Sequence, residues 1–323
     1  MRATRVVARG RVEFVEAPAP VLGPGQVLVR PLLVAICGSD VRTVYYRPEA
    51  EYPLRVGTSG HEMVGRVEAA DAPGQGLEAG DLALVLVPHE DAMAELFRAA
   101  AEDVLVLPPG RPLEELLMAQ QLGTVIYACK RLPSLMDRDV VVIGQGSAGL
   151  FFDAVCRRMG ARRVIGLDVK EARVAAGLRM GASHTVNNAR VDALAAVQEL
   201  TDGRLADLVV EAVGEPETIN LAPRLARVGG QLLYFGIPRV ESLQFDFWGF
   251  FRKYCQTLTL AGSASEPGRR SFRLALEWIA RGEIDVSRMI THRFPWERVA
   301  EAYELARTRD DGAIKVLVQM PAG

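Results

Sequence analysis

Two short motifs in the first part of the chain carry side chains that can bind a metal. Cys37 opens the run Cys37-Gly-Ser-Asp40, and His61 stands between Gly60 and Glu62. Thiolate and imidazole are ligands that zinc prefers. Either residue alone is more often an ordinary buried side chain. Together the two motifs predict a zinc site with Cys37 and His61 as ligands.

A glycine-rich motif further along the chain predicts a dinucleotide site. Gly144, Gly146 and Gly149 follow an apolar strand pattern and open a helical one. The first glycine permits a tight turn, the second lets the backbone approach a pyrophosphate, and the third lets the helix pack close to the strand. The candidate contacts with phosphate include the whole loop at the helix N-terminus, namely Gly144, Gln145, Gly146, Ser147, Ala148 and Gly149.

An acidic residue after the next strand predicts which dinucleotide binds. Asp168 lies where a ribose-binding carboxylate belongs, and it would repel a 2′-phosphate, so the sequence favours NAD over NADP. Arg173 is a further candidate cofactor contact. With Lys170 it could accommodate the extra phosphate, but a solvated start of a helix is the simpler interpretation of both residues. A metal that polarises an alcohol oxygen and a cofactor that accepts hydride together indicate a dehydrogenase.

Length and charge narrow the class of protein. At 323 residues the chain exceeds a typical single core, which predicts two domains. The formal net charge of -2 gives no sign of a basic stripe, so we expect no nucleic-acid partner. No run approaches the ~20 apolar residues that span a bilayer, and the first ten residues lack a signal-peptide pattern. The four cysteines are scattered, as in a reducing compartment. We therefore expect a cytoplasmic protein without a membrane partner.

The order of predicted elements indicates a β-rich domain and an α/β domain. Apolar runs broken by glycine and proline predict strands at 26–36, 62–69, 81–87 and 104–107. After a helical stretch at 113–131, predicted strands at 139–143, 163–167, 205–212, 231–235 and 258–261 alternate with helical patterns that include 147–159 and 171–180. Such alternation predicts a doubly wound parallel sheet, because parallel crossovers need a helix. Helices at 271–281 and 296–307 and a strand at 314–319 are expected to return to the first domain. The predicted boundaries are 1–117, 118–262 and 263–323.

Taken together, these motifs resemble the zinc-containing medium-chain dehydrogenase/reductase family, nearest its sorbitol, threonine and glucose dehydrogenase branches. Further matching stretches are Gly80-Asp81, 207–214, Gly229-Gly230 and 312–316. The resemblance implies a GroES-like β-rich catalytic domain (1–117 with the return segment 263–323), a Rossmann domain (118–262), and an active site in the cleft between them. It also implies a small-molecule alcohol substrate and a homodimer formed by edge strands of the Rossmann sheets. The aromatic cluster at 245–251 is expected to pack in a core or an interface.

The resemblance assigns roles to several residues. Cys37 and His61 fall on zinc ligands, Asp40 on the residue that orients His61, and Ser39 on the hydroxyl that takes the substrate proton. Arg42 stands where many relatives carry a proton-relay histidine. Because arginine stays protonated, the relay would be shortened or would end in water. With Arg47 or Arg55 it could instead bind an anionic substrate, although ordinary surface arginines are at least as plausible.

The chain departs from the family pattern at two places, the third ligand position of the catalytic zinc and the segment that binds a structural zinc in most relatives. Relatives with a carboxylate ligand carry Glu-Pro-Leu where this chain has Gln120-Gln121-Leu122, which puts Gln120 at the third ligand position. An amide oxygen is a weaker zinc ligand than a carboxylate, which makes Glu62 an alternative ligand. Between Asp81 and Ala94 there is no cysteine, so we expect no structural zinc, and His89 is expected to be an ordinary loop residue.

These observations predict an enzyme that uses zinc and NAD to oxidise a secondary alcohol, such as a polyol, a sugar or an amino alcohol. One alternative is a zinc-free reductase of the same superfamily that acts on a C=C bond or a ketone. Gln120 and the missing relay histidine favour this alternative, which leaves the Cys37 and His61 motifs unexplained. The other alternative is a non-catalytic NAD-binding redox sensor.

Overall fold

The computed structural model describes residues 1–87, 91–260, 262 and 266–321, so His89 lies outside the described part. The chain forms two compact units. Unit 1 consists of residues 1–123 and 264–323, and unit 2 of residues 124–263. Unit 1 is therefore built from two separate stretches of the chain.

Unit 1 is organised around a mostly antiparallel sheet with the strand order β14-β15-β3-β4-β5-β7, in which β6 also pairs with β3. Its strands are β3 (Gln26–Ile36), β4 (Glu62–Asp71), β5 (Leu82–Leu86), β6 (Phe97–Ala100), β7 (Val104–Val106), β14 (Ile290–Pro295) and β15 (Lys315–Gln319). A separate hairpin joins β1 (Arg2–Ala8) and β2 (Arg11–Glu16), and it had no counterpart in the sequence prediction. Buried side chains from β3, β4 and β15 share one hydrophobic core with Trp296 and Tyr303.

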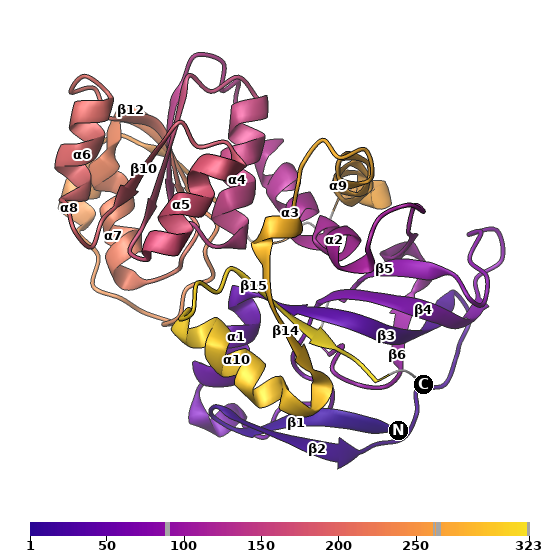
Figure 1. Ribbon diagram of the computed structural model, residues 1–323. Coiled ribbons are helices and arrows are strands. Elements are labelled where there is room, and N and C mark those ends of the chain that lie inside the picture. Colours follow the sequence, from indigo (N-terminus) through magenta and orange to yellow (C-terminus); the bar gives the residue numbers. More distant parts are fainter. Residues whose placement is uncertain (88–90, 261, 263–265, 322–323) are drawn as a thin grey trace. The chain divides into compact units, whose positions relative to one another are not determined.

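Short helices close the ends of this sheet. They are α1 (Gly38–Tyr45), α2 (Leu113–Leu117), the start of α3 (Ala119–Cys129), α9 (Arg270–Ala280) and α10 (Val299–Thr308), with 3₁₀ turns at Glu49–Glu51, Ala101–Asp103, Pro267–Arg269, Ser287–Met289 and Trp296–Arg298. Helix α10 packs against β15 and α1, so the end of the chain lies beside its beginning (Figure 1). The stretch predicted as helical from 113 to 131 contains two helices, α2 and α3.

Unit 2 is a six-stranded parallel sheet with the order β10-β9-β8-β11-β12-β13. Its strands are β8 (Asp139–Ile143), β9 (Arg163–Asp168), β10 (His184–Asn187), β11 (Ala206–Glu211), β12 (Ala226–Tyr234) and β13 (Gln256–Thr259). Helices α4 (Ser147–Arg158) and α5 (Glu171–Met180) cover one face, and α6 (Ala193–Leu200) and α7 (Pro216–Leu225) the other (Figure 1). The strand order changes direction at β8, which in such sheets marks the ligand-binding crevice. The predicted fold class, a GroES-like β-rich domain with a doubly wound α/β domain, is confirmed.

Ion pairs hold the amino ends of the central strands in unit 2. Asp139, the first residue of β8, is buried and accepts hydrogen bonds from Arg162 (2.6 and 3.1 Å) and Arg163 (2.8 and 3.3 Å). Arg227 and Arg138 similarly bind Asp207 next to the start of β11. These contacts lie at the amino ends of the strands. The glycine-rich loop follows β8 at the opposite end of the sheet, where the strands have their carboxyl ends.

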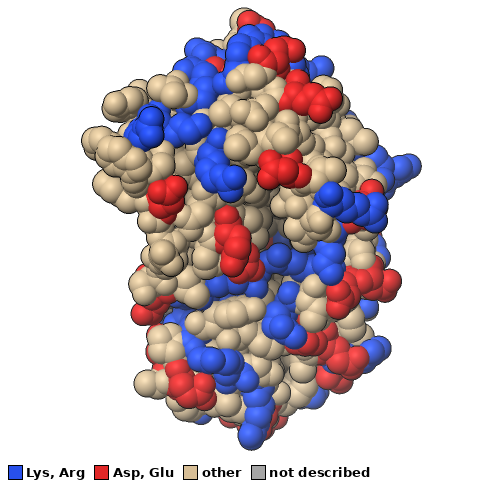
Figure 2. Space-filling model, turned by 90° about the vertical axis from the view of Figure 1, so that its left-hand side faces the viewer, with Lys and Arg blue, Asp and Glu red and all other residues tan. Residues whose placement is uncertain are grey.

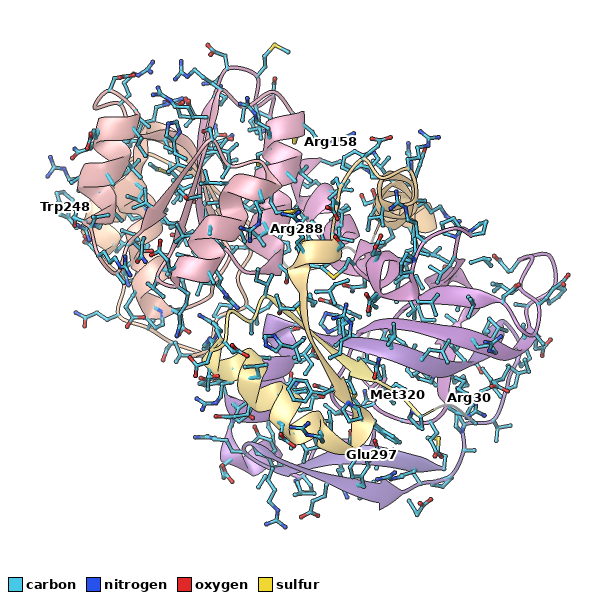
Figure 3. The ribbon with its side chains drawn as sticks, in the orientation of Figure 1. Arg30, Arg158, Trp248, Arg288, Glu297 and Met320 are labelled. Atoms are coloured by element: carbon cyan, nitrogen blue, oxygen red, sulfur yellow. The ribbon has the colours of Figure 1, made fainter. Side chains whose placement is uncertain are left out.

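The aromatic cluster of unit 2 is divided between its core and its surface, because Phe250 packs against the core. Helix α8 (Phe247–Phe251) exposes Phe247, Trp248 and Phe251, and Trp248 points outward from the helix (Figure 3). Acidic and basic side chains are interspersed on the face of the molecule seen in Figure 2. None of the helices in the described part has the length and apolar character of a bilayer-spanning segment.

Candidate metal centre and dinucleotide site

Strand pairing in unit 1 brings the two metal-binding motifs together. Cys37 follows the end of β3 and caps α1, while His61 immediately precedes β4. Since β3 and β4 are antiparallel, with Ala35 opposite Glu62, the end of one strand lies beside the start of the other. One ligand atom from each of Cys37, His61 and Glu62 lies within 4.8 Å of the others. This is a donor set of thiol, imidazole and carboxylate, which suits zinc.

Asp40 connects the two motifs. Its buried carboxylate accepts the Cys37 N–H at 2.7 Å and the Gly60 N–H at 3.0 Å, and it lies 3.4 Å from Nδ1 of His61. With Nδ1 directed at Asp40, Nε2 is the imidazole nitrogen available to a metal. The expected role of Asp40, orienting His61, therefore has a geometric basis.

The protonation of His61 reflects these neighbours. Burial by itself would lower the pKa of His61, but the Asp40 carboxylate and the Cys37 sulfur raise it well above its usual value of 6.5. Zinc binds a neutral imidazole and a thiolate, so loading the site with zinc would release protons.

A glutamine amide completes the surroundings of Cys37. Nε2 of Gln121, on the first turn of α3, lies 3.7 Å from the Cys37 sulfur. Oε1 of Gln121 is buried and has no hydrogen-bond partner among the described residues. The two amide atoms exchange places by a half-turn of the group. With the amide turned round, the carbonyl oxygen would face the Cys37 thiol, where it could bind a cation. Gln120, the expected third ligand, is the preceding residue and is partly buried, and its role as a ligand stays a prediction.

Glu62 already has a cationic partner. Both of its carboxylate oxygens accept hydrogen bonds from Nζ of Lys315, at 3.0 and 2.8 Å, and both side chains are fully buried. Lys315 begins β15, which pairs with β3. Sequence reasoning missed this residue. One sequence signal was available for it. Only four of the 38 basic residues are lysines, and one of these lysines lies in a buried strand.

The remaining predicted catalytic residues lie on or near α1. Ser39 and Arg42 belong to this helix and are partly buried. Arg47 forms an ion pair with Glu51 at 2.8 Å. Arg55 lies 3.3 Å from Asp91. Each of these last two guanidinium groups thus has an acidic partner, which does not favour their binding of an anionic substrate.

The glycine-rich loop of unit 2 has the backbone that its sequence predicts. Gly144 has a positive φ of 92°, a region that suits glycine. A side chain on Gly149 would overlap the carbonyl oxygen of Gly144, so only glycine lets α4 approach β8 this closely. At Gly146 the nearest atom to an added Cβ is Nη1 of Arg173, 3.5 Å away. The space beside Gly146 is therefore open to a phosphate.

The predicted ribose carboxylate is tied to this loop. Asp168 ends β9, and its oxygens accept the Gln145 N–H at 2.8 Å and the Lys170 N–H at 2.9 Å. The side chain of Gln145 is fully buried, so its backbone, not its amide group, belongs to the binding surface. Ser147 and Ala148 form the first turn of α4.

The interpretation of Arg173 as part of a solvated helix start is wrong. Its side chain is buried against the loop, because α5 directs it back toward Gly146 and Asp168. Burial lowers the pKa of the Arg173 guanidinium, and the Asp168 carboxylate partly offsets this effect. A buried cation beside the open turn is suited to phosphate oxygens.

Comparisons with known proteins find a family match in each of the two units. Residues 23–105 match the alcohol dehydrogenase GroES-like domain family, and residues 148–281 match the zinc-binding dehydrogenase family. An alcohol dehydrogenase from Cupriavidus necator is 26% identical over 99% of this chain and 98% of its own length. The sorbitol dehydrogenase of Bacillus subtilis is 24% identical over 93% of this chain and 92% of its own.

A solved structure extends the similarity to three dimensions. The alcohol dehydrogenase TADH from Thermus sp. ATN1 superposes with a TM-score of 0.83 at 26% identity, covering 99% of this chain and 100% of that one. The two matched families together span about two thirds of the chain. The family implies a catalytic zinc and a nicotinamide cofactor, and the donor set at Cys37 and the loop at Gly144 fit these groups. The chain belongs to the zinc-containing medium-chain dehydrogenase/reductase family and is an oxidoreductase of the alcohol dehydrogenase type.

Proposed function

We propose that this protein is a zinc-dependent dehydrogenase that transfers hydride between a secondary alcohol and NAD. The observation that carries the proposal is the cluster of Cys37, His61 and Glu62, with ligand atoms within 4.8 Å of one another. The unpartnered Gln121 oxygen beside it supports the same assignment. Zinc bound by these residues would supply a Lewis acid that lowers the pKa of an alcohol and stabilises the alkoxide.

The side chains around the cluster have separate tasks in this proposal. Asp40 keeps Nδ1 of His61 occupied and holds the backbone on both sides of the site. Ser39 accepts the hydroxyl proton of the substrate. Arg42 cannot accept a proton, so the proton passes from Ser39 to water.

The loop and the β9 carboxylate would hold the cofactor. The pyrophosphate would lie at the N-terminus of α4 beside Gly146, with the Arg173 guanidinium close by. Asp168 would accept the ribose hydroxyls and disfavour a 2′-phosphate, which supports NAD. The alcohol and sorbitol dehydrogenases among the relatives support an alcohol, and a polyol, sugar or amino alcohol is the substrate class we infer.

A panel of alcohols and polyols, with NADH formation as the signal, tests this function. The protein is treated with chelator and assayed with and without added zinc, and its zinc content is measured after purification without chelator. We expect activity to require zinc and to be lost in Cys37→Ser. Cys255→Ser is the matched control, because Cys255 belongs to unit 2 and lies outside the cluster.

A zinc-free reductase is the second candidate. The observation in its favour is the Lys315 ammonium, which already neutralises Glu62 without a metal. Turnover of a ketone or an activated C=C bond that survives both chelation and Cys37→Ser would establish this alternative. Nucleotide binding without turnover of any compound would instead indicate a redox sensor.

We also infer a homodimer that forms through unit 2. Strand β13 is the last strand of the described sheet, and most of its residues are exposed. Phe247, Trp248 and Phe251 of the preceding helix add exposed aromatic surface. Sedimentation analysis should give twice the chain mass for the wild type and a shift toward monomer for Trp248→Ser; a monomeric wild type would refute the inference.

A further inference from the structure

Three buried polar atoms beneath the glycine-rich loop are unsatisfied. Oε1 of Gln145 and both carboxyl oxygens of Asp153 have no hydrogen-bond partner in the described part of the chain. Both side chains are fully buried. A buried polar group without a partner costs about 1–3 kcal/mol, and more if it is charged. Three such atoms in one place require a chemical explanation.

The position of the Gln145 amide shows which of its atoms needs a donor. The side chain runs inward between β9 and α5, where Gly166 and Gly177 leave room for it. An added Cβ on Gly166 would come within 2.6 Å of the Gln145 amide carbon. Nε2 donates to the carbonyl oxygen of Val142 at 3.4 Å. Oε1 therefore faces away from Val142 and needs a donor from another residue.

Asp153 can supply that donor only as a neutral acid. It lies on the second turn of α4, and its side chain interacts with that of Gln145. Burial raises the pKa of Asp153 well above its usual value, and this effect outweighs the lowering that an amide N–H of Gln145 would cause by donating to the ionised carboxylate. A neutral carboxyl group has one O–H, which can donate to Oε1 of Gln145. Turning the amide round would instead place Oε1 against the Val142 carbonyl, acceptor against acceptor.

A second buried titratable group, the Cys156 thiol, lies near Asp153. Cys156 lies three residues further on α4, and its neighbour Cys129 belongs to α3. The hydrogen bond between the two thiols, together with burial, raises the pKa of Cys156 well above its usual value. Gln145 belongs to the turn after β8.

The other end of Gln145 reaches the cofactor site. Its backbone N–H donates to the Asp168 carboxylate at 2.8 Å. We propose that Asp153 is a positioning residue of the dinucleotide site: as a neutral acid it donates a hydrogen bond to the Gln145 side chain, which fixes the Gln145 N–H that orients Asp168. This proposal rests on the proposed function, since it assumes that Asp168 binds the ribose of NAD.

Two variants of Asp153 separate this role from simple packing. Asp153→Asn keeps an N–H donor at the same position, so its Kd for NADH should stay within about twofold of the wild type. Asp153→Leu removes the donor, and its Kd should rise about three- to tenfold, as expected for one lost hydrogen bond. The kcat at saturating NAD should change less than twofold in both. Phe152→Leu, a buried residue on the same helix, is the packing control and should lower the melting temperature without changing Kd.

NADH fluorescence titration measures Kd, and amide hydrogen exchange of Gln145 in the cofactor-free protein gives a second readout. Exchange should be faster in Asp153→Leu and unchanged in Asp153→Asn. A wild-type Kd in Asp153→Leu overturns the proposal, and so does binding by Asp153→Asn as weak as that of Asp153→Leu. If the wild type binds neither NADH nor NADPH, the proposed function fails, and Gln145 exchange alone decides whether Asp153 positions the loop.

Discussion

Lys315→Met should destabilise unit 1 severely, because it leaves the buried Glu62 carboxylate without the ammonium to which both of its oxygens bond. Both carboxylate oxygens of Glu62 bond to the lysine ammonium, and neither side chain is exposed. Removing one partner of a buried ion pair typically costs about 3–5 kcal/mol. Folded domains are stable by only about 5–15 kcal/mol, so the loss is a large share of the total.

The double variant Glu62→Met/Lys315→Met separates charge from packing. It removes both charges and keeps side chains of similar length. Replacing a whole buried ion pair by well-packed hydrophobic side chains of similar volume is often neutral or stabilising by about 1–4 kcal/mol. We therefore expect the double variant to be about as stable as the wild type and well above Lys315→Met.

Urea unfolding of the zinc-free protein, followed by tryptophan fluorescence, measures these differences. Trp296 is fully buried in unit 1, whereas Trp248 of unit 2 is 67% exposed, so the fluorescence change reports mainly on unit 1. A loss below about 1 kcal/mol in Lys315→Met would refute the reasoning, since it lies outside the range for a broken buried pair. A double variant as unstable as the single one would show that the lysine stem, not its charge, is required.

The same unfolding experiment can be repeated in the presence of zinc. In Lys315→Met a bound metal would replace the lost ammonium as a cation next to Glu62, so saturating zinc should raise the stability of this variant more than that of the wild type. Equal stabilisation of both proteins would mean that Glu62 does not contact the metal.

Asp40→Asn should weaken zinc binding about 10- to 100-fold, the usual effect of losing a partner that orients a ligand; competition with a chromogenic chelator measures it, and an unchanged affinity would contradict the role of Asp40. Burial alone would raise the pKa of Asp139, but hydrogen bonds from its two arginine partners lower it below the usual 3.8. Its contribution to stability is therefore present above about pH 4 and is lost as the pH falls through the lowered pKa. Asp139→Asn should flatten the acid limb of the stability profile, followed by circular dichroism, and an identical profile would count against the assignment. Gly149→Ala should cost at least about 1–3 kcal/mol, because its methyl group overlaps the loop backbone. Gly146→Ala should keep the melting temperature and weaken NADH binding, because the space it fills is open in the cofactor-free protein; similar losses of stability in both glycine variants would show that the two positions are not distinct.

Features set by neighbouring residues were the most predictable. The positive φ of Gly144 and the close approach at Gly149 are demands of one turn, so the spacing of the glycines suffices to predict them. Cys37 and His61 lie at the adjoining ends of two paired strands, so one antiparallel pairing brings them together. The doubly wound α/β fold of unit 2 follows from the alternation of strands and helices in the same local way.

Features that depend on distant elements were not predictable. Gln120 and Gln121 point about 100° apart on a helix, so which one meets Cys37 depends on the rotation of α3 against β3. The burial of Gln145 depends on glycines in two other elements, β9 and α5. Arg173 looked like a surface residue because nothing in its own helix indicates that it turns back toward the loop.

The pairing of Glu62 with Lys315 has a consequence for the order in which the protein assembles during synthesis. The two residues are 253 positions apart, and the intervening chain contains all of unit 2. At translation rates of about 5–20 residues per second, Lys315 follows Glu62 by roughly 10–50 s. Unit 2 is continuous and can fold within that interval, while the β4 carboxylate still lacks its partner. The metal centre, begun by the first residues of the chain, is therefore among the last parts of the protein to be completed.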